Sequence, residues 1–105
     1  MKIRNVNSNP ALENPHNVKA TKIYDANNTI VVHMTLNPGE SLKPHKTPVG
    51  VFFYILEGEP TIEIGEERQK VSQDSIADSP ANIVHCIYNE TEKIARFLVV
   101  KLNTP

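Results

Sequence analysis

The stretch that decides the fold is KPHKTPVGVFFYILEG, residues 43–58. It carries one histidine, His45, followed by an apolar run at 51–56 and a closing Gly58. Aromatic and β-branched residues favour strands. Because every position of the run is apolar, it predicts a strand that is covered on both faces. The stretch therefore predicts a pair of strands, and it leaves open whether His45 belongs to a functional site.

Short apolar runs separated by Pro, Gly, Asn and Asp continue along the chain, which is typical of an all-β sandwich or barrel. We expect roughly eight to ten short strands and little helix, which suits a two-sheet jelly roll or a closed barrel. A chain of 105 residues is one domain, with residues 1–17 as an irregular N-terminal arm and residues 18–105 as the barrel. The expected strands are residues 19–24, 29–36, 41–45, 51–56, 61–64, 69–71, 75–77, 83–88 and 94–102.

The charge pattern argues against several classes of partner. Eleven basic and twelve acidic residues give a net charge of −1, without a basic stripe, so we expect neither a nucleic-acid nor a membrane partner. No apolar run reaches the roughly 20 residues that span a bilayer, and the N-terminus lacks the apolar core of a signal peptide. We therefore expect a cytoplasmic protein. The single cysteine, Cys86, allows no internal disulfide, and we interpret it as a small buried residue.

Two of the four histidines do not suggest a site. His16 lies between Pro15 and Asn17 in the N-terminal arm, where we expect it to be solvated. His33 falls on the more polar face of its expected strand, which favours a surface or interface histidine over a ligand.

The other two histidines occupy strand positions bounded by turn residues. The same-face neighbours of His85 are Ile83 and Ile87, so the side chain of His85 should point into the core. His45 and His85 are then either core histidines, each satisfied by one hydrogen bond, or a pair of imidazoles that meet inside the barrel. Periodicity cannot decide between these alternatives.

The first stretch resembles a known motif. Gly39 is followed by five residues and His45, and Gly58 closes the pattern at the spacing of the first motif of the cupin family. That motif has a second histidine where Thr47 stands, and a glutamate where Val51 stands.

A later stretch resembles the second cupin motif. Pro80, His85 and Asn89 match it, while Asp74 and Asn82 stand at its two glycine positions. Asp and Asn are the residues that best tolerate positive φ in place of glycine. The resemblance covers about residues 19–102 and implies a single cupin domain, an all-β jelly-roll barrel also called a double-stranded β-helix.

The resemblance also implies a metal site, which is degenerate here. The family typically uses three histidines and one glutamate, of which only His45 and His85 remain. Neutral Thr47 is a poor ligand and Val51 is none, whereas a catalytic metal usually has about three protein ligands and an open position. A divalent metal is therefore allowed but not favoured, and the cofactor stays open. The side chains considered as a further ligand are Tyr54, Glu57 and Glu63.

The resemblance implies a barrel interior that is open at one end. Such a pocket is a common small-ligand site. The favoured function is therefore binding of a small molecule in a histidine-containing pocket. A metal-dependent dioxygenase or isomerase using His45 and His85, and a metal-free enzyme using histidine as acid or base, stay as alternatives. Whether the protein is an enzyme is open, and we assign no catalytic residue. The residues expected to line the pocket are His45, Thr47, Val51, Phe53 and His85.

The resemblance, together with the apolar surface of residues 51–56 and 94–102, also predicts a homodimer. A nucleotide cofactor is not expected, because the chain contains none of the glycine-rich phosphate-binding motifs.

Overall fold

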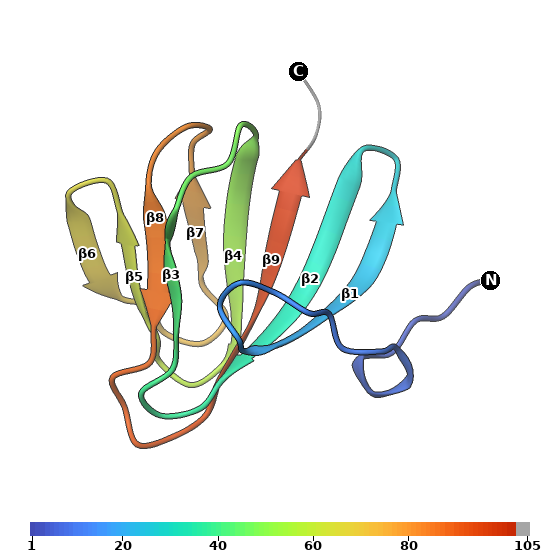
Figure 1. The fold of residues 1–105 in the computed structure, drawn as a ribbon, viewed down its shortest axis with the longest axis horizontal. Coiled ribbons are helices and arrows are strands. Elements are labelled where there is room, and N and C mark those ends of the chain that lie inside the picture. The colour runs from blue at the N-terminus through green and yellow to red at the C-terminus, as the bar shows by residue number, and fades with distance from the viewer. Residues whose placement is uncertain (103–105) are drawn as a thin grey trace.

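The structure is a computed structural model that describes residues 1–102. Apart from one short 3-10 turn, η1 (Val6–Ser8), its regular elements are strands, which confirms the all-β prediction. Figure 1 shows them arranged as a barrel-like jelly roll with the N-terminal arm across its front. The nine strands of the described residues are β1 (Lys19–Ala26), β2 (Thr29–Leu36), β3 (Ser41–His45), β4 (Gly50–Glu57), β5 (Thr61–Ile64), β6 (Glu67–Lys70), β7 (Ile76–Ser79), β8 (His85–Tyr88) and β9 (Ala95–Leu102).

The strands form two antiparallel sheets. One has the order β1-β2-β9-β4-β7 and the other has the order β3-β8-β5-β6. The last strand, β9, lies between β2 and β4, so residues from both ends of the barrel sequence share the centre of the larger sheet (Figure 1). Two packed antiparallel sheets in which neighbouring strands are distant in the sequence are the topology of a jelly roll.

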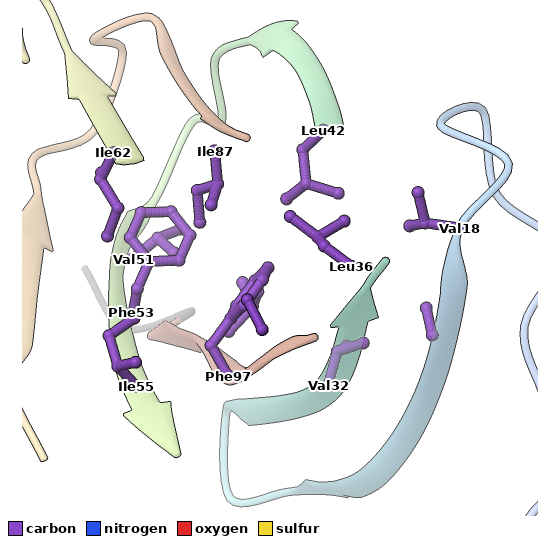
Figure 2. Close-up of a cluster of buried hydrophobic side chains, with 13 residues drawn as sticks. Val18, Val32, Leu36, Leu42, Val51, Phe53, Ile55, Ile62, Ile87 and Phe97 are labelled. Carbon is purple, nitrogen blue, oxygen red and sulfur yellow. The ribbon is translucent and has the colours of Figure 1, made fainter. Parts of the chain in front are cut away.

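The core lies between the two sheets. Alternate residues of β4, Val51, Phe53 and Ile55, point into it, and Phe97 of β9 packs on the same side (Figure 2). The prediction that residues 51–56 are covered on both faces is only half right. The outward residues of β4 are partly buried, because within the described chain no second layer of strands lies over the outer face of the five-stranded sheet.

Several strand boundaries differ by one or two residues from the sequence-based expectation. β6 begins at Glu67 rather than at residue 69, and β8 begins at His85 rather than at residue 83. Asn82 has a φ of 64° and closes a turn, so Ile83 cannot continue the strand and is 39% exposed. The other expected glycine substitute, Asp74, has a φ of 65°. Both residues therefore take the backbone conformation predicted for them.

The N-terminal arm runs beside the barrel and bonds to it. The backbone N–H of Leu12 donates to the carbonyl of Ala20. Two arm amides donate to nearby carbonyls as well, Asn9 to Lys22 and Asn14 to Val18. Within residues 1–102 no helix has the length and apolar character that a membrane span requires.

Candidate functional site

The structure brings His45 and His85 together. The two residues are cross-strand partners on β3 and β8, and their Nε2 atoms lie 3.2 Å apart. Their rings meet edge to face, with centroids 4.4 Å apart. His85 is 2% exposed, as its inward orientation predicts. Of the two alternatives left open by the sequence, the geometry supports a pair of imidazoles that meet inside the barrel.

The partners of the pair determine where the protons sit when both rings are neutral. The carbonyl of Lys43 lies 2.9 Å from Nδ1 of His45, and a carbonyl only accepts, so this nitrogen carries the proton. Nε2 of His45 is then an acceptor, and Nε2 of His85 donates to it. Nδ1 of His85 in turn accepts from the hydroxyl of Ser79 at 2.8 Å. A chain of hydrogen bonds therefore runs from Ser79 to the backbone of β3.

Ser79 is a site residue that sequence reasoning missed. It is buried at the end of β7, where it pairs with Val51. Its hydroxyl needs a partner there, because a buried polar group without one costs free energy. A serine six residues before an inward histidine was the only sequence signal.

The prediction that His16 is solvated is wrong. The ring of His16 is half-buried, with its centroid 5.1 Å from that of His45. Nδ1 of His16 accepts a 2.8 Å hydrogen bond from the backbone N–H of Lys43. Asn14 shapes the turn that places it, because its side-chain oxygen accepts from the N–H of His16. The Asn-Pro-His sequence predicts a turn, but not the strand against which that turn packs.

The remaining predicted pocket residues surround the histidine pair unevenly. Val51 and Phe53 are buried in β4, and the Phe53 ring meets the His85 ring edge to face at 5.4 Å. The hydroxyl of Thr47 instead donates to the carbonyl of Val49 in its own loop, at 2.9 Å.

Burial keeps the inner histidine neutral. Desolvation, followed by repulsion from His45 and Lys101, lowers the pKa of His85 to about 4. The pKa of His16 is lowered as well, again chiefly by burial and then by His45. Both groups are therefore neutral in the folded protein near pH 7.

The lowered pKa of His85 predicts a loss of stability in acid. The unfolded chain binds this proton near pH 6.5, whereas the folded chain binds it only near pH 4. The free energy of unfolding should therefore decrease as the pH falls from 6.5 to 4, by on the order of 2 kcal/mol from this group. Urea titrations of the wild type and of His85→Gln across this range measure the effect as the difference in their pH dependence. Equal pH dependence in the two proteins would contradict it.

The residues present do not fit the metal site that the resemblance to the cupin family implies. The two Nε2 atoms could both face one cation if the proton of His85 moved to Nδ1, where Ser79 would accept it. However, Thr47 bonds to its own loop and Val51 is apolar. Among residues 1–102 no group of three or more His, Cys, Asp or Glu side chains is arranged to hold a metal ion. Two imidazoles fall short of the usual ligand set of a catalytic metal.

The three side chains considered as further ligands are engaged elsewhere. The hydroxyl of Tyr54 donates to Asp74, and Glu57 pairs with Arg96. Glu63 accepts from Tyr88 at 2.7 Å.

Cys86 points away from the site. It is 7% exposed, as expected for a small buried residue. Burial and then the charge of Glu63 raise the pKa of its thiol, which disfavours the reactive thiolate.

A cavity of about 450 Å³, here called the inner cavity, lies between β5, β6 and β7. Ile62 and Ile64 of β5 and Ala77 of β7 belong to the apolar part of its lining. Most of the lining is polar or charged, and these residues are Glu67, Arg68, Gln69, Lys70, Ser72, Ser75 and Asp78. None of the five predicted pocket residues lines it. It nevertheless adjoins the histidine pair, because Ile64 is the cross-strand partner of His85.

Comparisons with known proteins agree with this architecture. The family model of the cupin domain matches residues 32–101, and no curated protein sequence matches the chain. The crystal structure of TT1209 from Thermus thermophilus is 27% identical, has a TM-score of 0.83 and covers 100% of both chains.

Two further solved structures share the fold at lower identity. A predicted oxalate decarboxylase from Thermotoga maritima is 18% identical, with a TM-score of 0.87 over 98% of this chain and 100% of that one. The polyketide cyclase RemF from Streptomyces resistomycificus is 20% identical, with a TM-score of 0.85 over 99% of this chain and 80% of that one. These likenesses concern the fold, whereas the family model spans well over half of the sequence. The chain therefore belongs to the cupin domain family.

Proposed function

We propose that the protein binds a small organic molecule inside its barrel, in the inner cavity. The observation that carries this proposal is the cavity itself. Its volume of about 450 Å³ lies within the range of ordinary small-molecule sites. Its lining places isoleucine side chains beside charged residues such as Arg68 and Asp78, which suits a ligand with an apolar and a polar part.

The hydrogen-bonded side chains of Ser79, His85 and His45 lie behind the wall of the cavity and supply polar groups to the proposed site. Ala77 lines the cavity, and Ser79, two residues further along the same face of β7, bonds to His85. A ligand that displaces the side chain of Ile64 would meet this pair. We infer that His85 and Ser79 orient the polar end of the ligand, while His45 fixes the ring of His85.

Two enzymatic alternatives receive less support. A metal-dependent dioxygenase or isomerase would rely on His45 and His85, and these supply two ligands where about three are usual. A metal-free acid–base enzyme needs a catalytic pKa near the working pH. The pKa of His85, lowered to about 4, lies well below that range.

A ligand screen with a cavity-filling variant tests the proposal. Compounds from a library of small neutral amides and polyols that bind the cavity should raise the melting temperature of the wild type. Ala77→Leu should abolish these shifts by occupying the cavity. Ala81→Leu, the same change in an exposed turn, should preserve them. Shifts that survive in Ala77→Leu would contradict the proposal. Stabilisation by Zn²⁺ or Fe²⁺ that depends on His45 and His85 would favour the metal alternative instead.

The predicted homodimer stays a proposal as well. Phe52, Tyr54 and Ile76 form an apolar area on the outer face of β4 and β7, and Ile76 is largely exposed. A second copy of the chain is the partner proposed for this area. Sedimentation velocity at micromolar concentration tests it, and a monomer there would contradict it.

A further inference from the structure

We propose a second binding site, on the outer face of the five-stranded sheet, for a small organic anion with a compact apolar body. It is a cavity of about 380 Å³, here called the outer cavity, between η1 and strands β1, β2 and β9. It lies on the opposite side of the sheet from the inner cavity. The residues that carry the proposal are Lys19, Ile23, His33, Leu56, Arg96 and Leu98.

Strand register brings the polar groups of this site together. Lys19 of β1 is opposite Thr35 of β2, and Thr35 is opposite Arg96 of β9. Cross-strand partners share a face of a sheet, so these three side chains form one row on the outer face. Arg96 is in turn opposite Glu57 of β4, which ends the row.

The next row of the same face places an imidazole beside the two cations. His33 is opposite Thr21 on one side and Leu98 on the other. It is 5% exposed, because the arm covers this part of the sheet. Its pKa is lowered by burial and then by the positive charges of Arg96 and Lys19. The cavity thus combines two cations with a neutral imidazole that can donate a hydrogen bond.

Arg96 has a donor that the protein does not satisfy. Its Nε is buried and makes no hydrogen bond within residues 1–102. A carboxylate oxygen of Glu57 lies 3.3 Å from it, but outside hydrogen-bonding geometry. Buried donors without a partner are rare and call for an explanation. The Arg96 side chain is 40% exposed overall, so an anion in the outer cavity would accept from the accessible N–H groups of the guanidinium, and charged hydrogen bonds of this kind are the strong ones.

The rest of the lining selects among anions. Ile23, Leu56 and Leu98 present apolar surface to the cavity. A small inorganic anion would leave this surface unfilled, whereas a carboxylate attached to a compact apolar group would contact both parts. The ligand class is therefore a small apolar carboxylate rather than free phosphate or sulfate.

Titration with benzoate, followed by amide NMR shifts, tests this site directly. Benzoate should shift the resonances of Val6, His33 and Leu98 in a saturable manner. Benzamide, which has the same shape without the charge, and inorganic phosphate, which has the charge without the apolar body, should each bind at least about tenfold more weakly.

Two substitutions should act in opposite directions. Arg96→Gln should weaken benzoate binding about tenfold, because a charge-assisted hydrogen bond is lost. Glu57→Gln should strengthen it a few fold, because the competing carboxylate is removed. Arg68→Gln is the matched control, since Arg68 forms the comparable exposed pair with Glu90 on the other sheet, and it should leave the affinity unchanged.

Three results would overturn the proposal. Benzamide could shift the same resonances with equal affinity, Arg68→Gln could weaken binding as much as Arg96→Gln, or Glu57→Gln could fail to strengthen it. Because Ala77→Leu alters only the inner cavity, benzoate binding should survive in that variant. Its loss there would place benzoate in the inner cavity instead and would also overturn the outer site.

Discussion

Replacing Gly58 with alanine should destabilise the protein by about 3 kcal/mol or more. Gly58 has a φ of 80°, which disfavours any residue with a Cβ atom. A Cβ at this position would also lie 2.5 Å from the backbone oxygen of Ile94 and 2.9 Å from Cα of Ala95. Backbone atoms cannot move aside as a flexible side chain can, so the two loops would have to separate. Urea denaturation measures the loss.

Two other glycines allow the cost of positive φ to be separated from the cost of the close backbone contact at Gly58. Gly39 has a φ of 85° but open space around its Cβ position, so Gly39→Ala should show the backbone cost alone, about 1–2 kcal/mol. Gly50 has neither constraint, and Gly50→Ala should be close to neutral. If Gly58→Ala lost no more stability than Gly39→Ala, the close approach to Ile94 would not matter.

Replacing Asn89 with aspartate should cost about 3 kcal/mol near pH 7, although the two side chains have nearly the same shape. Asn89 is 1% exposed, and its amide donates to the carbonyls of Leu36 and Lys93 at 3.0 and 2.6 Å. A carboxylate has no proton to donate there, so it would oppose two carbonyl oxygens in a buried site. Thermal or urea unfolding measures the change.

The loss caused by Asn89→Asp should depend on pH in a defined direction. Burial beside carbonyls would raise the folded-state pKa of the new carboxyl above its unfolded value of about 3.9. The penalty is then present at neutral pH and is relieved as the pH falls toward 4 and below. Asn28→Asp, an exposed residue at a φ of 60°, should be nearly neutral at every pH. A penalty of Asn89→Asp that did not change with pH would show that the carboxyl stays solvated.

The parts of the fold that depend on neighbouring residues could be predicted from the sequence. Alternation along the strand correctly placed His85 on the inner face, because side chains in a strand alternate regardless of its partners. Asp74 and Asn82 were predicted at turns because positive φ is a preference of single residues.

The parts of the site that depend on distant segments could not be predicted. His45 and His85 meet only because β3 and β8 pair in one particular register, which no local pattern specifies. Ser79 reaches His85 from the other sheet, and His16 reaches His45 from the arm. The outer cavity likewise depends on the register that aligns Lys19 with Arg96.

The bonds between the arm and the barrel have a consequence for the behaviour of the protein at high concentration. An edge strand with unpaired carbonyls invites a strand from another molecule and can start aggregation. Along the free edge of β1 the arm occupies the carbonyls of Ala20 and Lys22, and Asn14 bonds the carbonyl of Val18 just before the strand. At an edge of the other sheet, the exposed residues 67–70 carry three charges in four positions. The arm therefore protects the barrel from intermolecular strand addition, as charge does at β6.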